Sequence, residues 1–201
     1  MASSMLALPA AGTTGAGVEG RRGILPLGVT IVGAGGLMVM GGLVAAYLAL
    51  KNGVRGVDWP PEDTSFDNYT ATTLSLTVLM AMITIEWAAY AIRKDFRGQA
   101  LFAFGLTAAL AIAHLNGLGY LINGFEFGVA DSAYAAVVHA LTLVPFLIGA
   151  IAVGAVVLVG LRAVGHQLSL ANYALMRAAA NAWHIAAIAW VIAYYTVYIT
   201  K

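Results

Sequence analysis

The stretch from Asn181 to Lys201 reads NAWHIAAIAWVIAYYTVYITK and has the length of one membrane-spanning helix. About 20 apolar residues, rising about 1.5 Å each, cross the hydrocarbon core of a bilayer. At helical spacings of three and four residues, one face of this helix would carry Trp183, Ala187, Trp190, Tyr194 and Tyr198. A lone anchor in lipid needs no such face, whereas a helix packed against protein does. We therefore predict that this stretch belongs to a bundle of membrane helices and faces its neighbours.

Composition supports a membrane protein. The chain has 201 residues, of which 61% are hydrophobic and 9% are charged, whereas soluble domains are about 25% charged. It contains no cysteine, which excludes disulfides, iron–sulfur clusters and thiolate metal sites. Its net charge is +1 and it has no Lys/Arg-rich tract, so nothing indicates a nucleic-acid partner.

Five apolar runs are long enough to span a membrane, at residues 23–50, 70–92, 98–122, 132–161 and 178–199. We predict an all-α fold, a polytopic bundle in which residues 21–201 form a single five-helix transmembrane domain. Residues 1–20 are small and nearly uncharged, which is typical of a disordered tail and not of a cleaved signal peptide. In the first run, Gly41 and Gly42 each precede an alanine by four residues, a spacing that predicts close contact with another helix.

The distribution of Lys and Arg predicts the orientation of the bundle. If the N-terminus is cytoplasmic, seven of these residues lie inside and three lie outside. The inner ones are Arg21, Arg22, Arg93, Lys94, Arg97, Arg162 and Arg177, and the outer ones are Lys51, Arg55 and Lys201. The predicted topology is a cytoplasmic N-terminus and an outside C-terminus.

Short patterns follow one another between Gly23 and Lys201: Trp59-Pro60-Pro61, Asn116 with Tyr120, Asp131 with Tyr134, and Trp183-His184 with Trp190, Tyr194 and Tyr198. Together they resemble subunit III of haem-copper cytochrome c oxidases. The last span has a Trp-His pair, a second Trp six residues after the His, and then Tyr-x-x-x-Tyr. The first outer loop has Trp-Pro-Pro, and the third span has an Asn-x-x-x-Tyr in place of the family's Gln-x-x-x-Tyr. The loop before the fourth span runs into it as Ala130-Asp131-Ser132-Ala133-Tyr134, close to the family's Ser-Asp-Gly-x-Tyr. The family's acids are replaced in the first and third spans, and its Gly-Phe-His-Gly-x-His is missing at residues 143–148.

The resemblance implies a non-catalytic subunit III in a bacterial plasma membrane, which binds phospholipid and supports subunit I in oxygen reduction and proton uptake. Its implied partners are oxidase subunits I and II, expected to carry haem and copper, and a cytochrome bc complex in a supercomplex. We expect no catalytic, cofactor-binding or metal-binding residue in this chain. The candidate packing or lipid contacts are Trp59, Asn116, Tyr120, Asp131, Tyr134, Trp183, His184, Trp190, Tyr194 and Tyr198. Asp131 is also expected to cap the fourth span.

Glu86 is the only carboxylate well inside any span, roughly 9 Å from the inner end of the second one. Acids inside membranes are costly and face protein or water. Two interpretations remain open. Glu86 is either a shallow acid that reaches the interface or pairs with Arg93 or Arg97, or a group on a proton-uptake route or at a subunit contact.

Two alternative functions remain open. His114 and His139 are predicted at matched depth on neighbouring antiparallel spans, where they could ligate one haem b in a small membrane anchor. In the ordinary interpretation, each histidine bonds a backbone carbonyl or a hydroxyl, and Asn116 is a candidate partner for His114. The second alternative is a transporter or channel, against which stands the absence of an inverted repeat.

Overall fold

Five long helices make up nearly all of the chain that the structure describes. The structure, a computed structural model, describes residues 15–53, 59–61, 64–168 and 173–200, with side chains from residue 23 onward. The helices are α1 (Gly15–Gly53), α2 (Asn68–Arg93), α3 (Arg97–Asn123), α4 (Ala133–Val164) and α5 (Tyr173–Tyr194), and a π-helical turn, η2 (Tyr195–Ile199), continues α5. Each of the five is long and apolar enough to cross a membrane, which confirms the predicted all-α fold with five spans.

Two helix boundaries differ from the prediction in ways that matter later. α5 begins at Tyr173 and not at residue 178, so Arg177 lies inside the helix and not in the preceding loop. α1 begins at Gly15, so the last residues of the predicted tail are helical. The rest of that tail lies outside the described residues.

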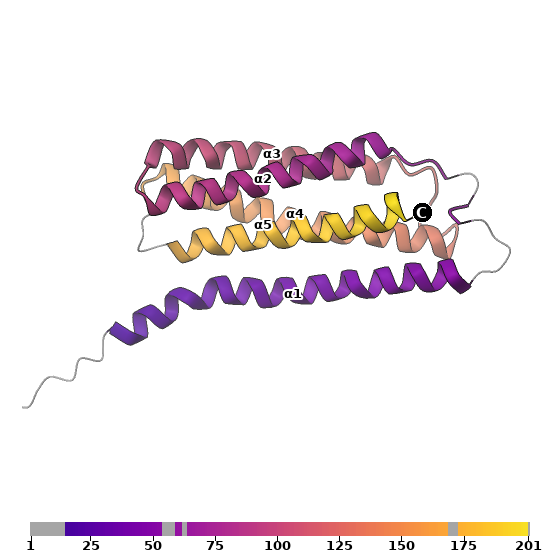
Figure 1. Cartoon of the computed structure of the whole chain (residues 1–201), viewed down its shortest axis with the longest axis horizontal. Coiled ribbons are helices and arrows are strands. Elements are labelled where there is room, and N and C mark those ends of the chain that lie inside the picture. The colour runs from indigo at the N-terminus through magenta and orange to yellow at the C-terminus, as the bar shows by residue number, and fades with distance from the viewer. Residues whose placement is uncertain (1–14, 54–58, 62–63, 169–172, 201) are drawn as a thin grey trace, which may run out of the picture.

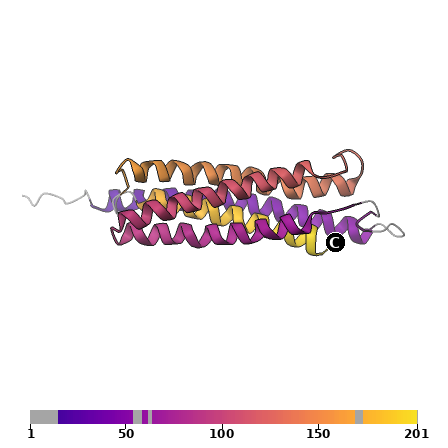
Figure 2. The same ribbon diagram turned by 90° about the horizontal axis from the view of Figure 1, so that it is seen from above.

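The helices run side by side along one axis, with α5 between α1 and α2 (Figure 1). Viewed from above, α4 lies behind this row (Figure 2). α5 packs chiefly against α4 and α1 and also contacts α2, while α2 packs chiefly against α3. The last helix of the chain is therefore the central one.

The aromatic face of α5 is buried, as its spacing predicts. Trp183 and Trp190 are fully buried, and Ala187 and Tyr198 are also in the core. Tyr194 is partly exposed at the edge of this face. Small side chains elsewhere on α5 let the neighbouring helices approach closely; those that are buried are Ala178, Ala179, Ala180, Ala186, Ala189 and Ala193.

Polar side chains cap two of the helices. Asp67 accepts a hydrogen bond from the Thr70 backbone N–H at 2.9 Å and another from the Thr70 hydroxyl. These bonds to Thr70 hold the pKa of Asp67 below its usual value. At α4 the predicted cap was wrong: Ser132, not Asp131, accepts from the Ala135 N–H, at 3.0 Å. Asp131 instead closes the preceding turn by accepting from the Gly128 N–H at 2.6 Å.

α1 lies at the edge of the bundle. Among its side chains from residue 23 onward, only Met40 and Tyr47 are buried. The predicted close contacts at Gly41 and Gly42 were wrong for this chain, because a Cβ added at either would meet nothing within 4 Å. The close approach is at Gly33 instead, where an added Cβ would collide with the side chain of Ile185 on α5.

Candidate functional site

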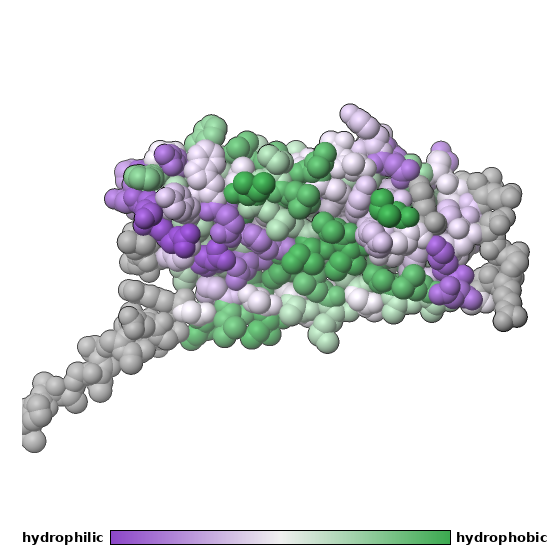
Figure 3. Space-filling view, viewed as in Figure 1, coloured by the Kyte–Doolittle hydropathy of each residue, from purple (hydrophilic) through white to green (hydrophobic). Residues whose placement is uncertain are grey.

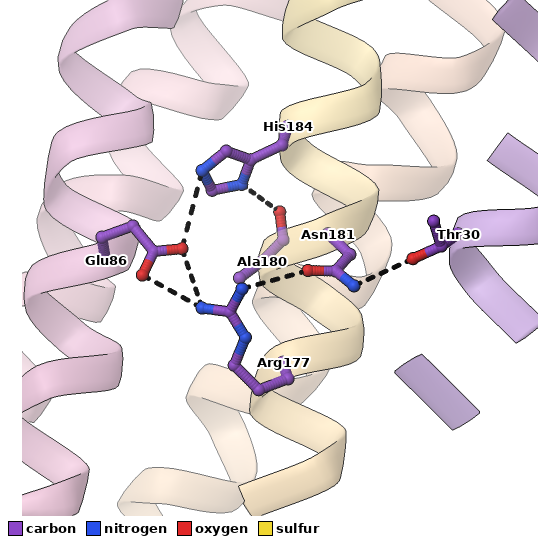
Figure 4. A network of polar contacts seen from close by, with 6 residues as sticks. All are labelled: Thr30, Glu86, Arg177, Ala180, Asn181 and His184. Atoms are coloured by element: carbon purple, nitrogen blue, oxygen red, sulfur yellow. Dashed lines mark hydrogen bonds and ion pairs between the residues drawn. The ribbon is translucent and has the colours of Figure 1, made fainter. Parts of the chain in front are cut away.

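A polar network joins α2 to α5 inside the predicted membrane region (Figure 4). The Arg177 Nη1 donates to both carboxylate oxygens of Glu86, at 2.9 and 3.0 Å. The Nε2 of His184 lies 3.6 Å from the Glu86 Oε1, and its Nδ1 bonds the backbone carbonyl of Ala180. Since a carbonyl only accepts, Nδ1 carries a proton, and Nε2 is the atom turned toward the carboxylate.

The network continues from α5 to α1. The Arg177 Nη2 donates to the Asn181 Oδ1 at 3.3 Å, and the Asn181 Nδ2 donates to the Thr30 Oγ1 at 3.0 Å. The Thr30 hydroxyl in turn donates to the backbone carbonyl of Pro26 at 2.9 Å. One connected set of hydrogen-bonded side chains therefore links α2, α5 and α1.

The structure supports an ion pair at Glu86 but corrects its partner. Arg97 donates to the carbonyls of Ala163 and Val164, and Arg93 lies over the ring of Tyr173 at 5.8 Å. Glu86 pairs with Arg177, which lies just before the predicted fifth span of residues 178–199. The missed signal was the spacing of Arg177, Asn181 and His184, which places three polar groups on one face of an otherwise apolar helix.

An aromatic cluster lies at the opposite end of the bundle. The Trp59 ring meets Tyr47 of α1 at 5.2 Å and Tyr134 of α4 at 4.7 Å between centroids, both edge to face. Residues 54–58, which precede Trp59, lie outside the described part of the chain. Edge-to-face aromatic pairs each add about 0.5–1.5 kcal/mol beyond burial. Trp59 thus packs against the neighbouring ends of α1 and α4.

His114 and His139 both bond backbone carbonyls, as the ordinary interpretation predicts. The His114 Nδ1 lies 3.2 Å from the Leu74 carbonyl, and its ring packs edge to face against Trp183 and Trp190. The His139 Nδ1 lies 2.9 Å from the Ala135 carbonyl. Asn116 was the wrong partner for His114, because it is exposed on the outer side of α3. That these histidines bind no haem remains a prediction.

The remaining candidate contacts divide between core and surface. Tyr198 stacks on Tyr194, with centroids 5.8 Å apart, and the Tyr194 hydroxyl lies 2.9 Å from the Thr72 Oγ1 on α2. Tyr120 is exposed on α3. Within the described residues, no group of three or more His, Asp or Glu is placed to hold a metal ion.

An apolar groove opens beside the network, between α1, α4 and α5. Its volume is about 760 Å³. Residues from all three helices line it, among them Leu25, Val32, Ile151, Leu158, Ala182 and Ile185. A groove with this lining fits a hydrocarbon chain.

The chain matches the model of a known protein family. The family model described as cytochrome c oxidase subunit III matches residues 22–201, which contain α2 to α5 and α1 from Arg22 onward. No curated protein matches the chain significantly.

Proposed function

Because the chain belongs to the cytochrome c oxidase subunit III family, we propose that it is the non-catalytic subunit III of a respiratory haem-copper oxidase in a bacterial plasma membrane. The observation that carries this proposal is the family match over residues 22–201, which contain five helical segments able to span a membrane. In this setting, oxidase subunits I and II are its partners, and they supply the haem and copper that reduce oxygen.

We propose that the chain supports subunit I in two ways. The first is lipid binding: the apolar groove between α1, α4 and α5 has the lining that a phospholipid acyl chain requires. The second concerns proton uptake. Glu86 and His184 are neighbouring titratable groups inside the predicted spans, so a contribution of this chain to proton uptake would reside there.

The orientation proposed for the chain follows its Lys and Arg distribution, with the N-terminus in the cytoplasm. The network then lies on the cytoplasmic side, where a respiratory oxidase takes up protons. A cytochrome bc complex is a further partner that this setting allows, in a supercomplex.

The test is turnover of the oxidase with and without this chain. Deletion of the chain should leave subunits I and II with their haem spectra but lower sustained oxygen consumption. Oxidase that turns over equally well without the chain contradicts a supporting role.

A narrower test addresses proton uptake. Glu86→Gln should slow proton uptake by less than tenfold, which is under about 1.4 kcal/mol of barrier. Glu126→Gln, in the loop between α3 and α4, is the matched control and should leave uptake unchanged. A proton-uptake rate unaffected by Glu86→Gln excludes the carboxylate from the route.

A further inference from the structure

The side of the bundle where α2 meets α5 carries polar side chains so deep in the membrane that lipid cannot supply hydrogen bonds to them. Glu86 is seven residues before the end of α2, about 10 Å along the helix, and His184 is eleven residues after the start of α5, about 16 Å along. The hydrocarbon core is about 30 Å thick. Long side chains near a helix end can reach the headgroups, but His184 lies too near the middle of the core to do so.

The part of the chain that the structure describes covers the ion pair in this region only partly. The side chains of Glu86 and Arg177 are 41% and 35% exposed, and both pairing oxygens accept from the same Arg177 nitrogen. Figure 3 shows hydrophilic residues extending inward over α2 and α5 from one end of the bundle. Acyl chains offer these groups no hydrogen bond, and uncovered charge within hydrocarbon is costly.

Polar groups continue along the same contact line into the other half of the bundle. The Trp190 Nε1 donates to the Ser75 Oγ at 3.1 Å, and the Tyr194 hydroxyl meets the Thr72 Oγ1 at 2.9 Å. We call this line the α2/α5 seam; its polar members are Thr72, Ser75, Glu86, Arg177, Asn181, His184, Trp190 and Tyr194. Leu79 lies on the same face of α2 as Glu86, two helical turns away.

The exposed surface of α4 has a different chemistry. Its large exposed side chains within the span are Leu143, Leu147, Ile151, Leu158 and Leu161, of which Ile151 and Leu158 also line the apolar groove. Acyl chains can cover such a surface without leaving any polar side chain unpaired, and the surface offers a protein partner no hydrogen bond. The bundle thus presents an aliphatic surface on α4, which suits lipid, and a polar surface along α2 and α5, which lipid tails do not suit.

We propose that the α2/α5 seam docks a transmembrane helix of another oxidase subunit, and that this helix brings a hydrogen-bonding side chain to the level of Glu86 and Arg177. The inference rests on the proposed function, since the partner is a subunit of the same complex. A protein helix is favoured over a lipid headgroup because the His184 side chain, 29% exposed, lies near the middle of the membrane, where headgroups do not reach.

Photo-cross-linking in the intact complex tests the seam directly. A benzophenone side chain replaces Leu79 on the seam or, as control, Leu147 on α4; both leucines lie near the middle of their helices, with exposures of 45% and 53%. The seam variant should yield a protein adduct that contains another oxidase subunit, and the α4 variant should yield lipid adducts. Lipid adducts alone at Leu79 overturn the proposal.

For the double variant Glu86→Leu/Arg177→Leu, we expect opposite effects on the stability of the isolated chain and on the assembly of the complex. In detergent the isolated chain should be at least as stable, because replacing an ion pair with apolar residues is often neutral or stabilising. Recovery of the partner subunits with the chain should fall about threefold or more, the effect of losing an interhelical hydrogen bond in a membrane. Unchanged or improved recovery overturns the proposal.

These results also separate the inference from the proposed function. If oxidase subunits purify with the chain but cross-link through α4, the α2/α5 seam is not the docking surface, and the proposed function still stands. If no oxidase subunit purifies with the chain, the proposed function itself fails.

Discussion

α5 and α1 are both apolar helices that could cross a membrane alone, yet α5 is central and α1 is peripheral. Eleven residues of α5 are buried, against two among the described side chains of α1. Hydrophobicity does not decide which of the two helices is buried, because lipid tails accommodate an apolar helix as well as a protein core does. What separates them is the content of α5: two tryptophans, several alanines and a row of polar side chains that neighbouring helices can satisfy. α5 therefore lies at the centre because it can pack closely and form hydrogen bonds with several neighbouring helices.

The largest effect that this comparison predicts is loss of a central tryptophan. Trp190 is fully buried, and its ring packs against His114, Tyr194 and Tyr198. Trp190→Ala should lower the free energy of unfolding in detergent by about 3 kcal/mol, because the cavity forfeits its packing contacts. On α1, Met38 is 79% exposed, and Met38→Ala should change that free energy by less than about 0.5 kcal/mol. Equal losses in the two variants would break the comparison.

Two glycines of α1 sharpen the comparison within one helix. An added Cβ collides with Ile185 at Gly33 and meets nothing within 4 Å at Gly35. Gly33→Ala should destabilise the chain by about 1 kcal/mol, because Ile185 must shift in a packed contact. Gly35→Ala should be neutral or stabilising by up to about 1 kcal/mol, since alanine is the better helix former. Thermal denaturation of both variants gives the answer, and the reverse order would mean that α1 packs through its other side.

The ion pair between α5 and α2 predicts a smaller effect. A double-mutant cycle of Glu86→Gln and Arg177→Gln should give a coupling of roughly 0.5–1 kcal/mol in the isolated chain. The value is modest because more than a third of each side chain is exposed. The cycle is measured by unfolding of the four proteins in one detergent. A coupling near zero would mean that the pair forms only when a partner covers it.

The smallest effect belongs to a helix end, outside both helices compared. The bonds from Thr70 lower the pKa of Asp67, so its charged form is favoured by folding. Its stabilising contribution is therefore fully present above the ordinary aspartate pKa of about 3.9 and is lost as the pH falls through the lowered value. Asp67→Ala should remove this part of the acid dependence of Tm below about pH 4. An unchanged acid profile would show that the cap does not contribute.

The sequence predicted the parts of the fold that depend on composition and local period. Five apolar runs and the spacing of Trp183, Ala187, Trp190 and Tyr198 were enough to place five helices and the buried face of the last one. Family membership, too, was predicted from short patterns in order along the chain.

The contacts of single polar residues were harder to predict. Glu86 and Arg177 are 91 residues apart in the chain, and hydropathy placed Arg177 in a loop because an arginine lowers the apolar score of the first turn of a helix. Asp131 and Ser132 can both cap a helix, and only the backbone decides between them. Gly41 and Gly42 have the spacing of a packing face, but spacing does not say whether the partner helix belongs to this chain.

The measurement that tests the central claim most directly is purification of the full-length chain, tagged, from its own membranes in mild detergent. We predict that it brings down a complex with haem and copper absorbance and cytochrome c oxidase activity, while the isolated chain shows no α-band in a dithionite-reduced minus oxidised spectrum. A stable complex that lacks every oxidase subunit would contradict the account. So would a sharp α-band from the isolated chain that disappears in His114→Ala or His139→Ala.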